Sequence, residues 1–234
     1  LHLSIRRQRQ MCIRDRYFNF SLGGGTVAEM VSAFWFSDAR AQLEEVTFGI
    51  SFFNFSANEN MNRFIEAEAV FDDRLLYFVN RSVARAAGQL VWAEITSARP
   101  QLEHPTMGRD EFWDYQLRVG APRIYGRYVY PEAYEGDLQR ILEHCRMRGV
   151  RVQFVIPPSH VDLQQKVAEF GLLAEQERFR AFLRRAAPTI DFDNPSELTT
   201  DRARFGDPFH PMAYKEIVDE VWGNARGLAV HSDP

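Results

Sequence analysis

The stretch that decides the fold is YFNFSLGGGTVAEMVSAFWFSDARAQLEEVTFGISFF, which covers residues 17–53. Residues 17–22 are aromatic and apolar and lead into three glycines, a pattern that predicts a buried strand stopped by a flexible turn. Thr26 can cap a helix, and the apolar residues after it recur at helical spacing to about residue 43. Residues 45–53 are rich in β-branched and aromatic side chains, which predicts the next strand. A strand, a glycine turn, a helix and a second strand in this order indicate a parallel sheet covered by helices.

Beyond residue 53 the pattern is mostly helical before strands and helices alternate again. Residues 54–130 are too long for a simple crossover, so we expect a helical insertion that acts as a cap. The later predicted elements are a helix from Pro131 that stops at Gly149, a strand over 150–156, a helical region over 161–187 broken near Gly171, a strand over 189–192 and a helix from Pro211 to about residue 224. We expect one α/β body over 17–225 and a loose tail over 226–234.

The size and composition of the chain fit a single folded domain. Of its 234 residues 45% are hydrophobic, which is enough for a sizeable core and too many for a disordered chain. No apolar run reaches the roughly 18 residues of a membrane span, and no export-signal pattern is visible. The two cysteines, Cys12 and Cys145, have no partner at metal-ligand spacing, so a disulfide framework and a zinc site are both disfavoured.

The first sixteen residues, LHLSIRRQRQMCIRDR, differ in character from the rest of the chain. They hold five of the 28 arginines and lysines of the chain and one of its 32 acidic residues. The remaining residues therefore carry 23 basic and 31 acidic side chains, a formal charge of −8. A body of that charge disfavours a nucleic-acid-binding surface. The basic end itself can be a nucleic-acid arm or a targeting peptide, but the string RRQRQMCIRDR resembles translated sequencing-adapter read-through from metagenomic gene fragments. We therefore expect residues 1–16 to be non-native and the natural sequence to begin near Tyr17.

The string with the clearest chemical content is FGDPFHP, residues 205–211. It places Asp207 three residues before His210, in a proline-held loop between the last predicted strand and the last predicted helix. An imidazole can take the proton of a serine hydroxyl when a carboxylate holds its tautomer and stabilises the imidazolium. The alternative is structural, with Asp207 as a turn or cap residue and His210 as a surface histidine.

In its context this D-x-x-H string resembles the corresponding block of the SGNH (GDSL-like) hydrolase superfamily. The resemblance covers about residues 17–223 and implies a flavodoxin-like three-layer α/β/α sandwich. It also implies a backbone oxyanion donor, for which Gly24 in NFSLGGGT matches best, and a side-chain donor, for which Asn54 in SFFN is the candidate. No aspartate follows Asn54, which departs from the G-x-N-D pattern of the family. The three glycines can also serve only to make a tight turn.

Two further residues are candidates for the substrate pocket of such a site. Ser51 lies just before Asn54, and His160 follows the predicted strand over 150–156 in the string IPPSH. A loop histidine that contacts solvent is the alternative interpretation of His160.

The resemblance also implies a nucleophilic serine at the end of a strand that precedes residues 17–22. Ser4 has no glycine or aspartate beside it to form a nucleophile turn, and Ser21 falls inside the predicted strand at a non-catalytic position. We therefore expect the nucleophile to be missing from this chain, upstream of Tyr17. In the flavodoxin-like order 2-1-3-4-5 the first strand is central. Its loss should leave unpaired backbone and apolar surface and make the chain poorly stable, unless residues 1–5 fill the gap.

The function implied by the resemblance is acyl-ester hydrolysis or acyl transfer, with a carbohydrate or another small molecule as the ester. Such chemistry needs no metal and no organic cofactor, and we expect no nucleic-acid partner. The branch related to bacterial polysaccharide O-acetyltransferases implies an exported or membrane-anchored parent, with any tether in the missing N-terminus. The alternative is a non-catalytic module that binds polysaccharide or a partner protein, using the aromatic residues Trp92, Phe112, Trp113, Tyr115, Tyr125, Tyr128 and Tyr130. A basic-armed nucleic-acid binder is a third possibility and requires residues 1–16 to be native.

Overall fold

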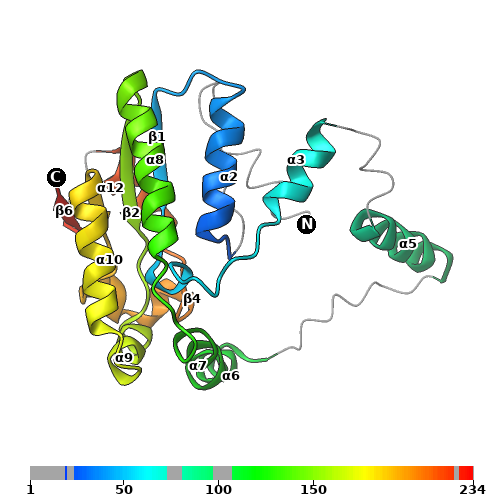
Figure 1. The fold of residues 1–234 in the computed structure, drawn as a ribbon. Coiled ribbons are helices and arrows are strands. Elements are labelled where there is room, and N and C mark those ends of the chain that lie inside the picture. The colour runs from blue at the N-terminus through cyan, green and yellow to red at the C-terminus, as the bar shows by residue number, and fades with distance from the viewer. Residues whose placement is uncertain (1–18, 20–23, 73–80, 97–106, 224–226, 234) are drawn as a thin grey trace.

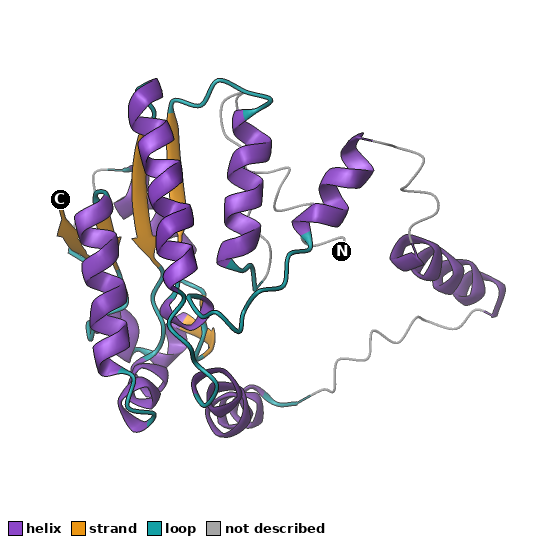
Figure 2. Ribbon diagram, viewed as in Figure 1, coloured by secondary structure: helices purple, strands orange, loops and turns teal. Residues whose placement is uncertain are grey.

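The computed structural model describes residues 19, 24–72, 81–96, 107–223 and 227–233. Over this part the chain is mixed α/β, with helices packed around a small, mostly parallel sheet (Figures 1 and 2). The sheet has the order β1 (Glu45–Gly49), β2 (Arg151–Ile156), β3 (Thr189–Asp191) and β6 (Val230–Ser232). The first three strands run parallel, and β6 runs antiparallel to β3. The predicted α/β class is thus confirmed, while the finer flavodoxin-like arrangement stays a prediction.

The helical elements connect and cover these strands. They are α2 (Val27–Asp38), α3 (Phe64–Asp72), α5 (Arg81–Thr96), α6 (Arg109–Tyr115), α7 (Ala121–Tyr125), α8 (Glu132–Arg148), α9 (Val161–Glu169), α10 (Leu173–Ala186), α11 (Glu197–Thr200) and α12 (Tyr214–Trp222), with the 3-10 turns η1 (Phe52–Asn54) and η3 (Arg202–Arg204) and the π-helical turn η2 (Gln116–Gly120). A second, two-stranded sheet pairs β4 (Phe205–Asp207) with β5 (His210–Pro211). No helix of the described part has the length and apolar character needed to cross a membrane.

Local chemistry sets the helix ends where the sequence predicts them. The Thr26 hydroxyl accepts the Glu29 amide hydrogen at 3.2 Å, and the Glu29 carboxylate accepts the Thr26 amide hydrogen at 3.0 Å, which is a capping box. Gly149 ends α8 with a φ of +70°, and Gly171 separates α9 from α10 with a φ of +71°. Both φ values lie in the left-handed region that favours glycine. The start at Thr26, the stop at Gly149 and the break near Gly171 are confirmed.

The strand predicted over 45–53 is shorter than expected. It ends at Gly49, because the chain turns into η1 just beyond it. The Ser51 carbonyl accepts hydrogen bonds from the amides of Asn54 and Phe55, both at 3.1 Å, and so closes a turn that an extended strand cannot contain. The aromatic residues that suggested a longer strand enter the core from this turn instead.

The described parts of residues 54–130 are mostly helical, as predicted, with turns and loops over 55–63 and 126–130. The end of this interval, α6 through α7, returns to the body of the molecule, because Trp113, Ala121 and Tyr125 are all almost fully buried. By contrast, α5 lies away from the sheet in Figure 1, and its Leu90 and Ile95 side chains are exposed. The strand predicted over 17–22 and the adapter-like residues 1–16 lie outside the described part, apart from Asn19.

The prediction of a loose tail is wrong for Val230–Ser232, which form β6 against β3. The cause is a buried carboxylate on α12. Glu220 is fully buried and accepts the amide hydrogens of Leu228 and Ala229 at 2.9 and 3.0 Å, and its Oε1 lies 3.0 Å from His231 Nε2. Nothing in the local pattern of the tail shows that a distant helix supplies this anchor.

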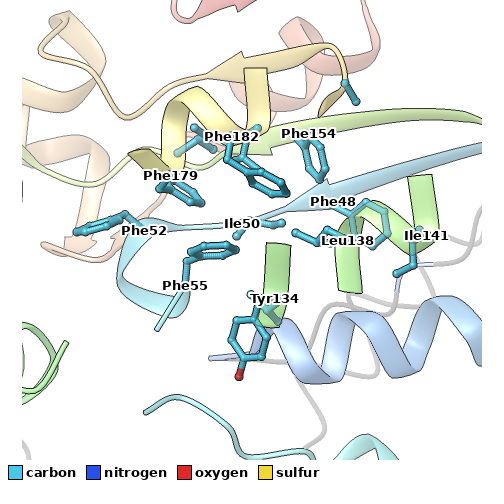
Figure 3. Close-up of a cluster of buried hydrophobic side chains, with 14 of the residues drawn as sticks. Phe48, Ile50, Phe52, Phe55, Tyr134, Leu138, Ile141, Phe154, Phe179 and Phe182 are labelled. Atoms are coloured by element: carbon cyan, nitrogen blue, oxygen red, sulfur yellow. The ribbon is translucent and has the colours of Figure 1, made fainter. Parts of the chain in front are cut away.

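The core lies on both faces of the sheet because side chains alternate along each strand. On one face, β1 and β2 pack against α8 and α10, and Figure 3 shows Phe48, Phe154 and Phe182 among the side chains gathered there. On the other face, Val155 and Ile190 pack in a cluster with residues of α12. Helices on both faces hold the sheet in place, and with it the turns that follow the ends of its strands.

An ion pair between a buried carboxylate and a partly exposed arginine joins the start of α2 to the chain that leads into α3. Glu29 is 2% exposed, and its carboxylate accepts hydrogen bonds from the Arg63 amide (2.8 Å), Arg63 Nε (2.7 Å) and Arg63 Nη2 (2.9 Å). These bonds lower the pKa of Glu29 from 4.5 to about 2, against the opposing effect of burial. The charged form is therefore favoured in the folded state.

We expect Glu29→Gln to lower the free energy of unfolding by about 2–3 kcal/mol at pH 7, because a neutral amide replaces the buried carboxylate that accepts three hydrogen bonds from Arg63. The folded pKa is depressed, so this contribution is present above pH 4.5 and declines as the pH falls towards 2. Urea unfolding at pH 7 and at pH 3 measures it, and the difference between wild type and variant should narrow at pH 3. Asp137→Asn, which breaks an ion pair with the exposed Arg140, is the control and should change stability by under about 0.5 kcal/mol.

Candidate functional site

The candidate site lies where the parallel strands end. Because β1, β2 and β3 are parallel, the turns that follow them emerge at the same edge of the sheet, which is where open α/β sheets place their sites. Since α2 leads back to the start of β1, its N-terminal end lies at this edge too. Figure 1 shows β4 at the same end of the molecule. The loop that carries Asp207 and His210 thus lies at the edge where the parallel strands end.

Asp207 and His210 form a hydrogen-bonded pair. His210 Nδ1 lies 2.9 Å from Asp207 Oδ1 and 2.8 Å from Oδ2. The Phe209 amide donates to Oδ1 at 2.9 Å, which fixes the carboxylate within the loop. The Asp207 side chain is 11% exposed, whereas the His210 side chain is 64% exposed. A buried acid therefore holds one nitrogen of an imidazole whose ring reaches solvent.

The electrostatics of this pair suit proton transfer. The hydrogen bond to Asp207 raises the pKa of His210 above 6.5, and burial opposes the shift. With Nδ1 facing the carboxylate, the neutral ring carries its proton on Nδ1 and leaves Nε2 as the basic nitrogen. The carboxylate then stabilises the imidazolium that forms when Nε2 takes a proton.

Three other histidines meet carboxylates in the described residues. His144 and His231 use the opposite nitrogen, Nε2, towards Asp38 and Glu220, at 2.9 and 3.0 Å. Both of those pairs tie helices or the tail to the body. His160 faces Asp162 with Nδ1 at 3.3 Å but is only 4% exposed, so of these four histidines His210 is the one that combines this orientation with an exposed ring.

Several contacts from other elements hold the loop in place. The His160 amide donates to the Pro208 carbonyl at 2.9 Å, and Arg109 Nη2 donates to the Phe205 carbonyl at 2.8 Å. The Phe209 ring packs edge to face on Phe53, with 5.1 Å between ring centroids. The loop is therefore fixed by the ends of β1 and β2 and by α6.

The π-helical turn η2 also reaches the loop. A methyl group at Gly120 would stand 3.7 Å from the Phe209 ring and 2.3 Å from Gln116 Oε1. The first of these distances is an ordinary van der Waals contact, so η2 lies close to the Phe209 ring of the loop. π-helical turns are rare and occur often at functional sites.

No described contact joins either predicted oxyanion residue to the pair. Asn54 ends η1 and follows Phe53, whose ring packs on Phe209 of the loop. Ser51 precedes the same turn and is partly exposed. Gly24 has a φ of +63°, lies three residues before the start of α2, and has open space where a Cβ would stand. A positive φ explains the glycine by itself, and no described contact joins Gly24 to His210.

His160 is not the solvent-contacting loop histidine of the alternative interpretation, and its place in a substrate pocket stays a prediction. It is 4% exposed, caps α9 by accepting the Asp162 amide hydrogen on Nδ1 at 3.2 Å, and packs between Trp113 and Phe205. His160 thus contacts the site loop through its ring, which packs on Phe205, and through its amide, which donates to the Pro208 carbonyl. A hollow of about 400 Å³ between η2 and α9, lined by Asp114, Leu117, Arg118, Asp162, Gln165, Lys166 and Glu169, includes neither His160 nor Ser51.

The predicted sugar-stacking aromatics are divided between core and surface. Trp113 and Tyr125 are buried in the core, which is the ordinary use of aromatic residues. Trp92 and Tyr115 are exposed at 67% and 42%. The two exposed rings belong to separate helices, α5 and α6, so the described residues do not present the predicted set as one surface.

Sequence analysis missed a buried polar cluster beneath the loop. The Asp193 carboxylate accepts hydrogen bonds from the amide and hydroxyl of Ser159, and Arg180 reaches Asp191 and Asp193. The signal was present in the string DFD, residues 191–193, because acidic residues at the end of a buried parallel strand point to this edge. Among the described residues, no group of three or more histidine, cysteine or acidic side chains converges as a metal site.

Comparisons of the chain with protein families, with curated proteins and with solved structures found no match in any of the three. What can be said of the site therefore rests on its own geometry.

Asp207→Asn should lower the pKa of His210, because the carboxylate that favours the imidazolium becomes a neutral amide. NMR titration of the imidazole C–H signals measures this change. Asp38→Asn, which alters the His144 pair, is the control and should leave the His210 titration as it is in the wild type. An unchanged His210 titration in Asp207→Asn would show that the pair does not form in solution.

Proposed function

We propose that Asp207 and His210 are the acid and base of a serine-dependent acyl-ester hydrolase or O-acyltransferase of the SGNH type. The observation that carries this proposal is the orientation of His210. Its Nδ1 is held by a largely buried carboxylate, and its exposed ring stands at the edge where the parallel strands end. A structural ion pair needs no such asymmetry between the two ring nitrogens.

In the proposed reaction, His210 Nε2 takes the proton of a serine hydroxyl as the serine oxygen attacks the ester carbonyl. The imidazolium, stabilised by Asp207, then gives that proton to the departing alcohol, leaving an acyl-serine. Water or an acceptor hydroxyl next attacks the acyl group as His210 takes its proton, and the acyl–serine bond breaks as His210 gives that proton back to the serine oxygen. The Gly24 amide and the Asn54 side chain are the proposed donors to the oxyanion, where one donor can contribute about 3 kcal/mol.

The serine is the part of this machinery that the described residues do not supply. None of their recorded hydrogen bonds joins a serine hydroxyl to His210, and Ser4 and Ser21 lie outside the described part. We propose that the nucleophile is encoded upstream of Tyr17, at the end of a strand that pairs with β1 in a flavodoxin-like sheet. The order of β1, β2 and β3, each next to its successor and parallel to it, supports that arrangement.

The proposed substrate is an ester of a carbohydrate or of another small molecule. Hydrolysis and transfer use the same groups, so the difference lies in whether water or an acceptor hydroxyl reaches the acyl-serine. The proposal requires no metal or organic cofactor. Contiguous genomic DNA upstream of the Tyr17 codon tests it first: a serine in a glycine- or aspartate-flanked turn is expected, and its absence would favour a non-catalytic binding module.

In the protein made from that longer gene, His210→Ala should lower kcat/KM for p-nitrophenyl acetate by about 10³–10⁴-fold, because serine loses its base. The matched control is His144→Ala, which removes a histidine that also faces a carboxylate but lies away from the strand ends. Its activity should remain within about threefold of wild type. Equal losses in the two variants would refute the proposed role of His210.

The same enzyme should become more active as the pH rises through the pKa of His210, because only the neutral imidazole can accept the serine proton. Asp207 raises that pKa above 6.5, so the rising limb should lie above this value. The pH dependence of kcat/KM measures it. The limb should move in Asp207→Asn, provided that this variant retains measurable activity. A limb at the wild-type pH in the active variant would show that another group titrates.

A further inference from the structure

The polar cluster that sequence analysis missed lies between the core and the Asp207–His210 loop. Asp193 follows β3 and is 7% exposed, a costly position for a carboxylate unless donors satisfy it. Burial raises the pKa of Asp193, against the opposing effect of its hydrogen bonds to Ser159. The group therefore needs an explanation that its own strand does not provide.

Three donors converge on a single oxygen of this carboxylate. Asp193 Oδ1 accepts the Ser159 amide at 2.9 Å, the Ser159 hydroxyl at 2.5 Å and Gln164 Nε2 at 3.1 Å. Gln164 Nε2 also donates to the Ser159 carbonyl at 2.9 Å. The turn after β2 is thus bound at both its amide and its carbonyl by groups that meet at Asp193.

The other side of Asp193 is held by an arginine from α10. Arg180 Nη2 donates to the Asp193 carbonyl at 2.5 Å and lies 3.6 Å from its Oδ2, while Arg180 Nε donates to Asp191 Oδ2 at 3.1 Å. The Asp193 amide donates to Asp191 Oδ1 at 2.9 Å. Because Arg180 is only 14% exposed, the carboxylate has little freedom to move.

The next residue of the same turn holds the site. His160 follows Ser159, and its amide donates to the Pro208 carbonyl at 2.9 Å. Pro208 lies between Asp207 and His210, and the Phe205 ring at the start of the loop packs on the His160 ring. The neighbouring residues Ser159 and His160 therefore connect Asp193, by hydrogen bonds on one side, to the Pro208 carbonyl in the middle of the loop on the other.

We propose that Asp193 is a positioning residue for the Asp207–His210 pair, acting through Ser159 and His160 on the Pro208 carbonyl. The hydrogen bonds to the Asp193 carboxylate fix the position of the turn. The turn in turn fixes the position of the Pro208 carbonyl, and this position determines how the His210 ring meets Asp207. This inference concerns the site of the proposed function, but it can be tested without any ester, so its failure and the failure of that function are distinguishable.

The experiment follows His210 by NMR in the full chain, using titration of its C–H signals and long-range ¹H–¹⁵N spectra that report which ring nitrogen carries the proton. Asp193→Ala should lower the pKa of His210 to a value between those of wild type and Asp207→Asn, and should reduce the fraction of the tautomer protonated on Nδ1. Ser159→Ala, which leaves Asp193 in place, should lower the pKa of His210 and the fraction of the Nδ1 tautomer too, but by smaller amounts than Asp193→Ala. Ser159→Thr retains the hydroxyl and should restore the wild-type values.

The matched control is Glu220→Ala, because Glu220 is also a buried carboxylate that binds backbone amides, but it anchors the tail. It should destabilise the protein and leave the His210 signals unchanged. If Asp193→Ala does not fold, the two Ser159 variants decide the question. Wild-type His210 signals in Ser159→Ala, or an equal shift in Glu220→Ala, would overturn the proposal.

Discussion

Parallel pairing of β1, β2 and β3 is the constraint from which the arrangement of the site follows. Each strand must return to the same starting edge, so each turn that leaves a strand end emerges beside the others. The loop over 205–211 is long enough to lie across these ends and is fixed there by backbone hydrogen bonds and aromatic contacts. The helices on both faces keep the sheet rigid, and this rigidity is what allows a short loop to hold a defined geometry.

Buried carboxylates perform related work at four junctions of the molecule. Glu29 joins α2 to the chain before α3, Asp193 joins the ends of β2 and β3, and Glu220 holds the tail. Each accepts backbone amide hydrogens, which satisfies part of the charge that burial would otherwise penalise. Asp207 and Glu220 also meet an imidazole, and the two pairs differ in the ring nitrogen, because Asp207 faces Nδ1 of His210 and Glu220 faces Nε2 of His231. The same type of contact that fixes the fold at three places thus leaves Nε2 of His210 away from the carboxylate at the fourth.

The parts of the fold that were predictable are those specified by neighbouring residues. The capping box at Thr26, the left-handed glycine at 149 and the apolar strand before Pro157 all depend on short patterns. The pairing of Asp207 with His210 was predictable for the same reason, since only two residues separate them. The anchoring of the tail by Glu220 and the burial of His160 beneath the loop were not, because each depends on residues that are distant in the sequence.

The hydrogen bond from Arg109 to the Phe205 carbonyl links the insertion to the histidine loop. Arg109 is the first residue of α6, and Phe205 lies two residues before Asp207. A shift of α6 along its axis would therefore act on the strand that leads into Asp207. During divergence, substitutions in the insertion could alter the geometry of the Asp207–His210 pair while the loop sequence stays the same.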